Sequence, residues 1–118
     1  MSNKTRQEPL TWQQFEQVGL CVGTIVKAEE FLEARQPAYK LWVDLGEALG
    51  VRRSSARITA LYTMGELIGK QVICVTGFPP KQIGPFISEV LVTGFYRSAD
   101  EVVLAVPDMP VANGSRLG

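Results

Sequence analysis

The chain has 118 residues and a mass of 13.0 kDa, which suits one compact domain rather than two. Hydrophobic residues make up 46% of the sequence and charged residues 20%, so a single core can be filled and wholesale disorder is not expected. The absence of histidine excludes Ser/His/Asp and Cys/His nucleophile sites and zinc sites built on imidazole. Catalysis by carboxylate, lysine or tyrosine groups stays open in principle.

The formal net charge is zero, with 12 basic and 12 acidic residues. This balance argues against a protein whose entire surface binds phosphate. The charges are nevertheless unevenly distributed along the chain. Residues 35–57 contain five cations and two anions, whereas residues 98–118 contain one cation and three anions. A local basic face in the middle of the chain is therefore compatible with the composition.

The N-terminal residues 1–10, MSNKTRQEPL, carry little apolar surface and predict a mobile lead-in to a single domain over residues 11–118. They lack the apolar run of a signal peptide. No apolar segment approaches the roughly 20 residues that a membrane-spanning helix needs. We therefore expect a cytoplasmic protein without a membrane span.

Neither the cysteines nor the carboxylates are spaced like ligands or nucleophiles. Cys21 and Cys74 lie in apolar segments and lack CxxC spacing, which predicts two buried free thiols, with a disulfide as the alternative. The acidic pairs are sequence neighbours whose side chains diverge in a strand. No metal site, cofactor or glycine-rich phosphate loop is therefore expected.

A short helix is expected at the start of the domain. Thr11 followed three residues later by Gln14 is typical of a capping box, which marks a helix N-terminus. Trp12 and Phe15 are three residues apart and so share one face of this helix. That apolar face should pack on another surface.

The next two segments are typical of strands. Residues 20–28 are rich in strand-forming residues, and Gly23 is the position at which a bulge or a sharp coil of the strand would be tolerated. Residues 39–45 alternate between apolar and polar, which predicts one buried face and an opposite face carrying Lys40 and Trp42. A cation would thus lie beside an aromatic ring outside the core.

A third strand is expected over residues 51–59, where period 2 places Arg53, Ser55 and Arg57 on one face. A short helix should follow near residues 63–68 and end at Gly69.

Three further strands are expected over residues 71–76, 86–92 and 101–106. Two successive prolines make residues 77–85 a loop or an edge. Five or six strands with no alternating βαβ pattern favour a small closed antiparallel barrel over a sandwich. An all-β, five-stranded OB-fold barrel fits this pattern best.

The residues also resemble a known family. FEQVGLCVGTIVKAEEF near the start, SSARIT and SEVLVTG in the middle, and VVLAVPDMPVANGSRLG at the end resemble CsaA-type proteins, a branch of the tRNA-binding-domain family of OB folds. The similarity extends from Phe15 to Gly118. It implies a homodimer in which terminal extensions form the interface, and tRNA binding on the barrel. It also implies binding of unfolded or presecretory polypeptides and contact with the export ATPase SecA.

The resemblance places SSARIT on the binding face and makes the neighbouring segment near Lys81 its border. Guanidinium groups fork onto phosphates, and hydroxyl groups add neutral hydrogen bonds. The family often has lysine or glutamine where this chain has Arg53 and Arg57. The candidate RNA-binding residues are Lys40, Arg52, Arg53, Ser54, Ser55, Arg57, Lys81, Gln82, Ser88 and Glu89.

Several of these features have a structural alternative. Trp42 is a stacking platform for a base, or it is covered by the neighbouring helix or a dimer partner. Three roles are open for Glu89: it accepts a hydrogen bond from a base, it orients a neighbouring arginine, or it makes a structural hydrogen bond. Phe31, Phe78 and Phe86 line a cavity for apolar peptide segments, or they pack in the core.

The sequence therefore predicts a non-enzymatic homodimer that binds tRNA through a basic barrel face. The alternative, which is compatible with it, is an export-related chaperone that binds polypeptides in apolar dimer grooves. The candidate dimer-interface residues are Trp12, Phe15, Pro107 and Pro110.

Overall fold

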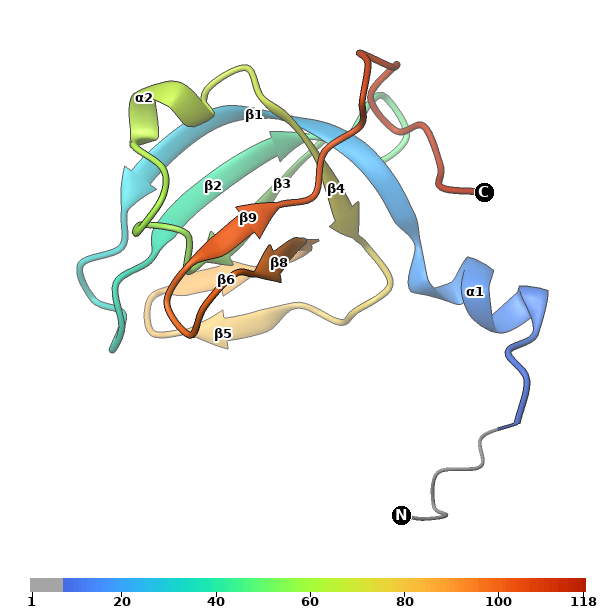
Figure 1. The fold of residues 1–118 in the computed structure, drawn as a ribbon, viewed down its shortest axis with the longest axis horizontal. Helices are drawn as coiled ribbons and strands as arrows, with labels where there is room; N and C mark the ends of the chain where they lie inside the picture. Colours follow the sequence, from blue (N-terminus) through green and yellow to red (C-terminus); the bar gives the residue numbers. More distant parts are fainter. Residues whose placement is uncertain (1–7) are drawn as a thin grey trace.

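The computed structural model describes residues 8–118 (Figure 1). The first seven residues of the expected lead-in lie outside the described part of the chain. Residues 8–10 are exposed and have no regular secondary structure.

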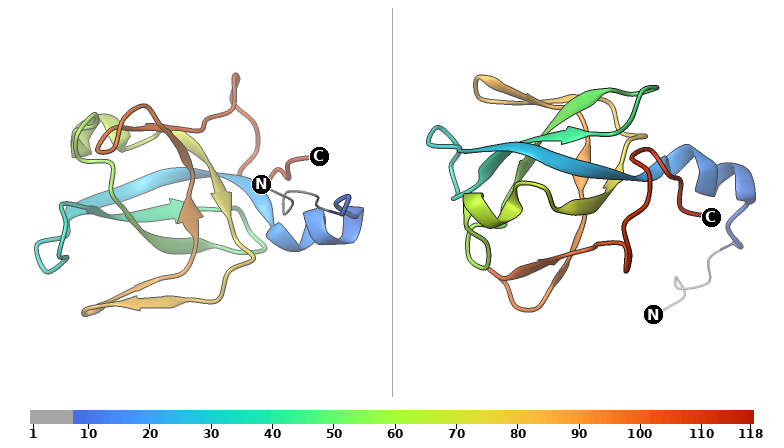
Figure 2. Two further views of the ribbon diagram at one scale, coloured as in Figure 1. Left: turned by 60° about the horizontal axis from the view of Figure 1, so that its bottom comes forward. Right: turned by 90° about the horizontal axis from the view of Figure 1, so that it is seen from above.

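Five strands form one antiparallel sheet in the order β3-β2-β1-β4-β7, which coils into a nearly closed barrel (Figures 1 and 2). Two small hairpins, β5–β6 and β8–β9, complete it. This architecture confirms the all-β OB-like fold. The elements are α1 (Trp12–Val18), β1 (Leu20–Glu30), β2 (Tyr39–Asp44), β3 (Val51–Ala56), α2 (Met64–Leu67), β4 (Gln71–Val75), β5 (Lys81–Ile83), β6 (Phe86–Ser88), β7 (Leu91–Val92), β8 (Gly94–Tyr96) and β9 (Val102–Leu104).

The core lies inside the coiled sheet and follows from the alternation of the strands. Along β2, the side chains of Tyr39, Leu41 and Val43 are buried, whereas the intervening residues are only partly covered. Leu67 of α2 is fully buried and packs within the same core cluster, so this helix contributes to the core through its last residue. Every other residue of β2 therefore remains available on the outside of the barrel.

Both short helices begin with a capping box. Thr11 and Gln14 exchange side-chain hydrogen bonds with each other's backbone N–H groups at the start of α1, as expected. Thr63 and Glu66 do the same for α2. The two helices differ in burial, because α1 has no buried residue and extends away from the barrel (Figure 1).

The bulge in β1 lies at Val26 rather than at Gly23. Pairing with β2 shifts by one residue between Ile25 and Lys27, so Val26 is the extra residue. Gly23 has a different role, because a Cβ atom there would lie 2.5 Å from Cγ1 of Val43. The glycine thus allows the two strands to approach closely inside the core.

Other short elements also differ from the sequence expectations. Residues 77–85, expected to be a loop or an edge, contain the short strand β5, which pairs with β6 in a hairpin outside the five-stranded sheet. The strand expected over residues 86–92 is divided into β6 and β7 by Glu89 and Val90. Strand β8 was not expected at all, and it is defined by its pairing with β9.

The C-terminal tail runs beside the first half of β1, at the end of the barrel where α1 ends and β1 starts (Figure 2). Gln71 donates to the carbonyl oxygen of Val111 at 2.7 Å and accepts from its N–H at 3.1 Å. The Thr24 hydroxyl donates to Oδ1 of Asn113 at 2.7 Å. These bonds fix a tail that has little regular structure of its own.

The cysteines are free and buried, as expected, and lie directly opposite each other on β1 and β4. Burial raises the pKa of Cys74 to about 12, so its thiol stays protonated at neutral pH. Among residues 8–118, no group of three or more histidine, cysteine, aspartate or glutamate side chains is placed to hold a metal ion. No helix of the described chain is long and apolar enough to cross a membrane.

Ser54 corrects one expectation for the binding face. Its side chain lies on the core-facing side of β3 and is fully buried, with 0% of its surface exposed. Its hydroxyl has no hydrogen-bond partner among the described residues. A side chain that points into the barrel cannot reach RNA. A buried hydroxyl without a partner carries a desolvation cost of about 1–3 kcal/mol.

Replacing Ser54 with alanine should therefore stabilise the protein. We expect Ser54→Ala to raise the free energy of unfolding by about 1 kcal/mol in urea titrations, because the alanine has no polar atom to desolvate. Ser55→Ala, on the opposite face of the same strand, is the control and should change stability by less than about 0.5 kcal/mol. A clear loss of stability in Ser54→Ala would contradict this reading of the core.

Candidate nucleic-acid interface

The outer face of β1, β2 and β3 carries two cross-strand rows of polar and aromatic residues. Residues directly opposite each other on antiparallel strands have Cβ atoms about 5 Å apart. The rows therefore form one continuous patch, which we call the outer face. Its two rows are Lys27–Trp42–Arg53 and Glu29–Lys40–Ser55, each in the order β1, β2, β3.

Lys27 belongs to this face although the sequence did not indicate it. Simple alternation along β1 places Lys27 on the same side as the buried Ile25. The bulge at Val26 changes this by bringing Lys27, instead of Val26, opposite Trp42. A lysine at an expected core position is the signal in the sequence that could have revealed the bulge.

Two neighbouring segments fold onto the outer face through a small second hydrophobic cluster. Phe31 and Phe86 are buried in it, and their rings lie edge to face with centroids 5.5 Å apart. We call this set the outer cluster; its buried members are Phe31, Ala38 and Phe86, with Ala34, Trp42 and Ile83 packed against them. It holds the loop between β1 and β2, and the β5–β6 hairpin, against the sheet.

Two of the three candidate peptide-binding phenylalanines are therefore core residues. Phe31 is 3% exposed and Phe86 is 5% exposed, so neither ring can take up an external ligand. Trp42 is also covered, but by Phe86 at 5.9 Å and by the Lys27 ammonium at 4.5 Å rather than by a helix. The aromatic residues of this face support it and do not form an open stacking platform.

The cations of the outer face lie over these rings. The Lys40 ammonium is 5.1 Å from the centroid of Phe31 and 5.7 Å from that of Phe86. The Arg53 guanidinium carbon is 5.5 Å from the Phe86 centroid. Contacts of this kind contribute about 0.5–2 kcal/mol each, and they restrict where the charged groups can point.

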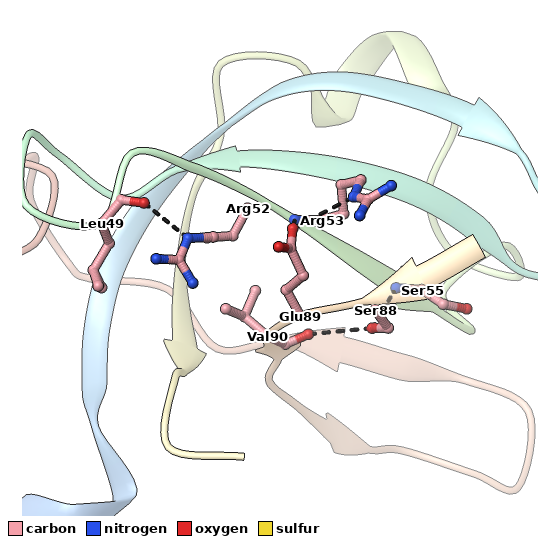
Figure 3. Close-up of polar contacts among 7 residues, drawn as sticks. All are labelled: Leu49, Arg52, Arg53, Ser55, Ser88, Glu89 and Val90. Carbon is pink, nitrogen blue, oxygen red and sulfur yellow. Dashed lines mark hydrogen bonds and ion pairs between the residues drawn. The ribbon is translucent and has the colours of Figure 1, made fainter. Parts of the chain in front are cut away.

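Arg53 is also held by Glu89, from the segment between β6 and β7 (Figure 3). Oε1 of Glu89 accepts from the backbone N–H of Arg53 at 2.9 Å and from its Nε at 3.4 Å. In return, the backbone N–H groups of Glu89 and Val90 donate to the Arg53 carbonyl at 2.7 and 3.2 Å. The carboxylate thus replaces a neighbouring strand at the edge of β3.

Ser88 makes the equivalent contact one step along the edge. Its hydroxyl accepts from the backbone N–H of Ser55 at 3.1 Å (Figure 3). Together, Arg53, Ser55, Ser88 and Glu89 form what we call the β3 closure. It joins the free edge of β3 to the β6–β7 segment and leaves the terminal nitrogens of Arg53 available. Ser88 and Glu89 are therefore structural residues beside the outer face.

The remaining candidates occupy different places. Arg57 is exposed and donates to Oε1 of Gln36 in the β1–β2 loop. Lys81 and Gln82 are exposed on β5, where Gln82 donates to the Gly84 carbonyl at 2.6 Å. Arg52 does not join the outer face, because its Nε donates to the Leu49 carbonyl at 2.8 Å on the other side of β3 (Figure 3).

Phe78 is the candidate phenylalanine that is exposed, with 58% of its surface accessible. It lies on the rim of a pocket of about 760 Å³ between the segment before β5 and the β6–β7 segment. The pocket adjoins the outer face because Ser55 belongs to both, and because Glu89 of the pocket contacts Arg53 of the outer face. We call it the hairpin pocket; it is lined by Ser55, Phe78, Pro79, Pro80, Lys81, Gln82, Ile83, Ser88, Glu89, Val90 and Leu91.

The cations of the outer face, together with the adjoining hairpin pocket, suit the binding of a nucleic acid, whose phosphate groups are anionic. The arginine and lysine side chains are presented from a rigid sheet, and an OB fold binds oligonucleotides on the corresponding face between the loops that flank it. The β1–β2 loop and the β5–β6 hairpin flank the outer face in the same way.

Comparison with known proteins also points to nucleic-acid binding. Residues 20–116 match the family described as "Putative tRNA binding domain". The methionine–tRNA ligase of Methanothrix thermoacetophila is 31% identical over 112 residues, which cover 94% of this chain and 16% of that protein. The chain thus spans about a sixth of the length of the curated relatives it matches.

Solved structures resemble the chain over almost all of its length. The crystal structure of chaperone CsaA from Bacillus anthracis is 43% identical, with a TM-score of 0.86, covering 94% of this chain and all of that one. The CsaA chaperone protein of Picrophilus torridus is also 43% identical, with a TM-score of 0.84, covering 93% of this chain and all of that one.

Proposed function

The chain is a CsaA-like member of the tRNA-binding domain family, and from this premise we propose that it binds tRNA through the outer face as a non-enzymatic homodimer. The observation that carries the proposal is the β3 closure, which fixes Arg53 on the sheet with its terminal nitrogens free. A guanidinium group held in this way can bind phosphate oxygens with two parallel hydrogen bonds.

The ion pairs of this region define where phosphate can bind. Lys27 pairs with Glu29 at 3.3 Å, and Lys40 pairs with Glu33 at 3.8 Å. Arg57 and Lys81, by contrast, have no ion pair with any residue from 8 to 118. Arg53 pairs with Glu89 at 3.4 Å, but through Nε alone, so its terminal nitrogens stay available. We infer that Arg53, Arg57 and Lys81 make the phosphate contacts, and that the paired lysines add a weaker attraction.

The distribution of charge limits the extent of the face. Asp100, in the β8–β9 turn, lines the same small pocket as Arg57. The acidic end of the chain therefore borders the basic face rather than lying far from it. Because the proposed contacts are between cations and phosphates, the affinity should fall as salt rises, and recognition should follow the shape of the RNA more than its sequence.

The first test is the affinity for tRNA measured across a salt series. In Arg53→Ala/Arg57→Ala, we expect weaker binding and a plot of log K against log salt whose slope is smaller in magnitude by about 1–2, because each lost phosphate contact removes roughly 0.7–0.9. Lys70→Ala removes a cation beside Tyr62, away from the outer face, and is the control. An unchanged affinity and slope in the double variant would mean that RNA binds elsewhere.

The homodimer is supported by apolar surface at one end of the barrel. Trp12 is 75% exposed, and its ring lies edge to face with that of Phe15, with the centroids 5.7 Å apart. The C-terminal tail lies at the same end, where Arg116 donates to the Glu16 carbonyl of α1 at 3.4 Å. Pro107 of this tail is half-buried and Pro110 is exposed. A second copy covering α1 and the tail would remove this apolar surface from water.

We expect the wild-type protein to sediment as a dimer at low micromolar concentration. Trp12→Asp should shift it toward monomer, because an exposed indole that anchors an interface is replaced by a charge. Leu32→Asp is the matched control: Leu32 is 82% exposed, but it lies in the β1–β2 loop and outside the proposed interface. A wild-type protein that sediments only as monomer would exclude the dimer.

Polypeptide binding is the second candidate function. Two similar solved structures are those of CsaA chaperones. Several large apolar side chains of this chain are more than half exposed, among them Trp12, Phe78, Phe95 and Met109. Such surface suits an unfolded or presecretory polypeptide. Contact with SecA and a cytoplasmic location belong to the same proposal and rest on the family resemblance.

The chaperone function is tested by the aggregation of a chemically denatured client protein. If it is correct, sub-stoichiometric amounts of this protein should suppress light scattering by the client. No suppression at several-fold molar excess would rule it out and leave RNA binding as the single proposed function.

A further inference from the structure

We propose that the hairpin pocket binds one unpaired nucleobase of the RNA held on the outer face, with the base stacked on Phe78. This inference rests on the proposed RNA binding. It adds a base-specific contact to a face that otherwise binds the phosphate groups and recognises the shape of the RNA. The pocket opens beside Arg53 and is formed by side chains from β5 and from the β6–β7 segment. Its volume of about 760 Å³ is in the range of small-ligand sites.

Phe78 provides the stacking surface. Its ring is 58% exposed and forms no aromatic pair among the described residues, unlike Phe31 and Phe86. Pro79 and Pro80 follow it directly and restrict the backbone, so the ring is presented from a stiff segment. An exposed aromatic ring beside a basic groove is the arrangement that binds the π-face of an unpaired base.

The polar atoms of the pocket favour a base that carries an amino group. Oε1 of Glu89 is occupied by Arg53, but Oε2 makes no hydrogen bond to residues 8–118. Gln82 uses its Nε2 to bond Gly84, which leaves its Oε1 free to accept. Glu89, Gln82 and Ser55 all line the pocket, so these two acceptors and the Ser55 hydroxyl are available to a bound base. Cytosine offers the N4 amino group to such acceptors, whereas uracil presents the O4 acceptor at the same position.

The charges around the pocket favour a nucleotide over an apolar peptide segment. Lys81 lines the pocket and has no ion pair within the described chain, so it can bind the phosphate of the inserted nucleotide. An apolar side chain would instead bury the carboxylate oxygen of Glu89 without a partner, which carries a desolvation cost. Charge complementarity thus selects the nucleotide as the occupant.

The test compares fluorescent cytidine and uridine decanucleotides, which differ mainly in the donor and acceptor groups of one base edge. We expect the wild-type protein to bind the cytidine oligomer about 10-fold more tightly, the value of one hydrogen bond to a charged acceptor. Phe78→Ala should weaken binding of both oligomers by roughly 5- to 100-fold, from the loss of stacking, and leave the salt slope unchanged. Phe95→Ala, another exposed aromatic outside the pocket, is the control.

Glu89→Gln tests the hydrogen bond to the base more directly than Phe78→Ala does. The amide oxygen can still accept from the N–H groups of Arg53, which turns the amide nitrogen toward the pocket as a donor. We expect the preference for cytidine over uridine to disappear or reverse in this variant. A variant that only disturbed the fold would lose binding of both oligomers and of tRNA together, so the ratio of the two oligomer affinities isolates the base contact.

The outcomes separate this proposal from the proposed function. Equal binding of the two oligomers, or full binding by Phe78→Ala, with tRNA binding that still depends on Arg53 and Arg57, would overturn the base pocket alone. Absence of any RNA binding would overturn both. If Phe78→Ala abolished protection of a denatured client but bound cytidine oligomers normally, the pocket would belong to polypeptides and the inference would be wrong.

Discussion

The barrel depends on how the free edge of β3 is joined to the segment after β6. The five-stranded sheet ends at β3 on one side and at β7 on the other, and regular strand pairing does not connect them. The β3 closure supplies the connection with side chains, as Glu89 and Ser88 accept from the backbone N–H groups of Arg53 and Ser55. The same bonds that complete the barrel place the Arg53 guanidinium on the outer face, so fold and proposed function share one set of contacts.

The aromatic residues illustrate how position decides the role of a side chain. Phe31, Trp42 and Phe86 have the composition of a stacking platform, yet they build the outer cluster that fixes the flanking loop and hairpin. Their role in the proposed RNA binding is indirect, because Lys27, Lys40 and Arg53 lie over their rings. Phe78 has no such partners among the described residues and stays exposed at the hairpin pocket.

The parts of the structure that follow from local chemistry could be predicted from the sequence. The alternation of β2 and the capping box at Thr11 are examples, because each depends on residues close together in the chain. The bulge at Val26, strand β8 and the β3 closure could not be predicted, because each is set by a partner distant in sequence. For the same reason, the expected binding residues Phe31 and Phe86 proved to be buried, and Lys27 was missed. The burial of Ser54, by contrast, follows from the local alternation of β3, which turns it away from Arg53 and Ser55.

The central claim is that RNA meets the protein at the face organised by the β3 closure, and nuclear magnetic resonance titration of the ¹⁵N-labelled protein with tRNA tests it most directly. The account predicts that the backbone amide resonances of Lys40, Arg53, Ser55 and Lys81 shift or broaden first, whereas those of Asp108 and Val111 in the C-terminal tail do not. Perturbations confined to α1 and the tail, with the β3 amides unchanged, would contradict it.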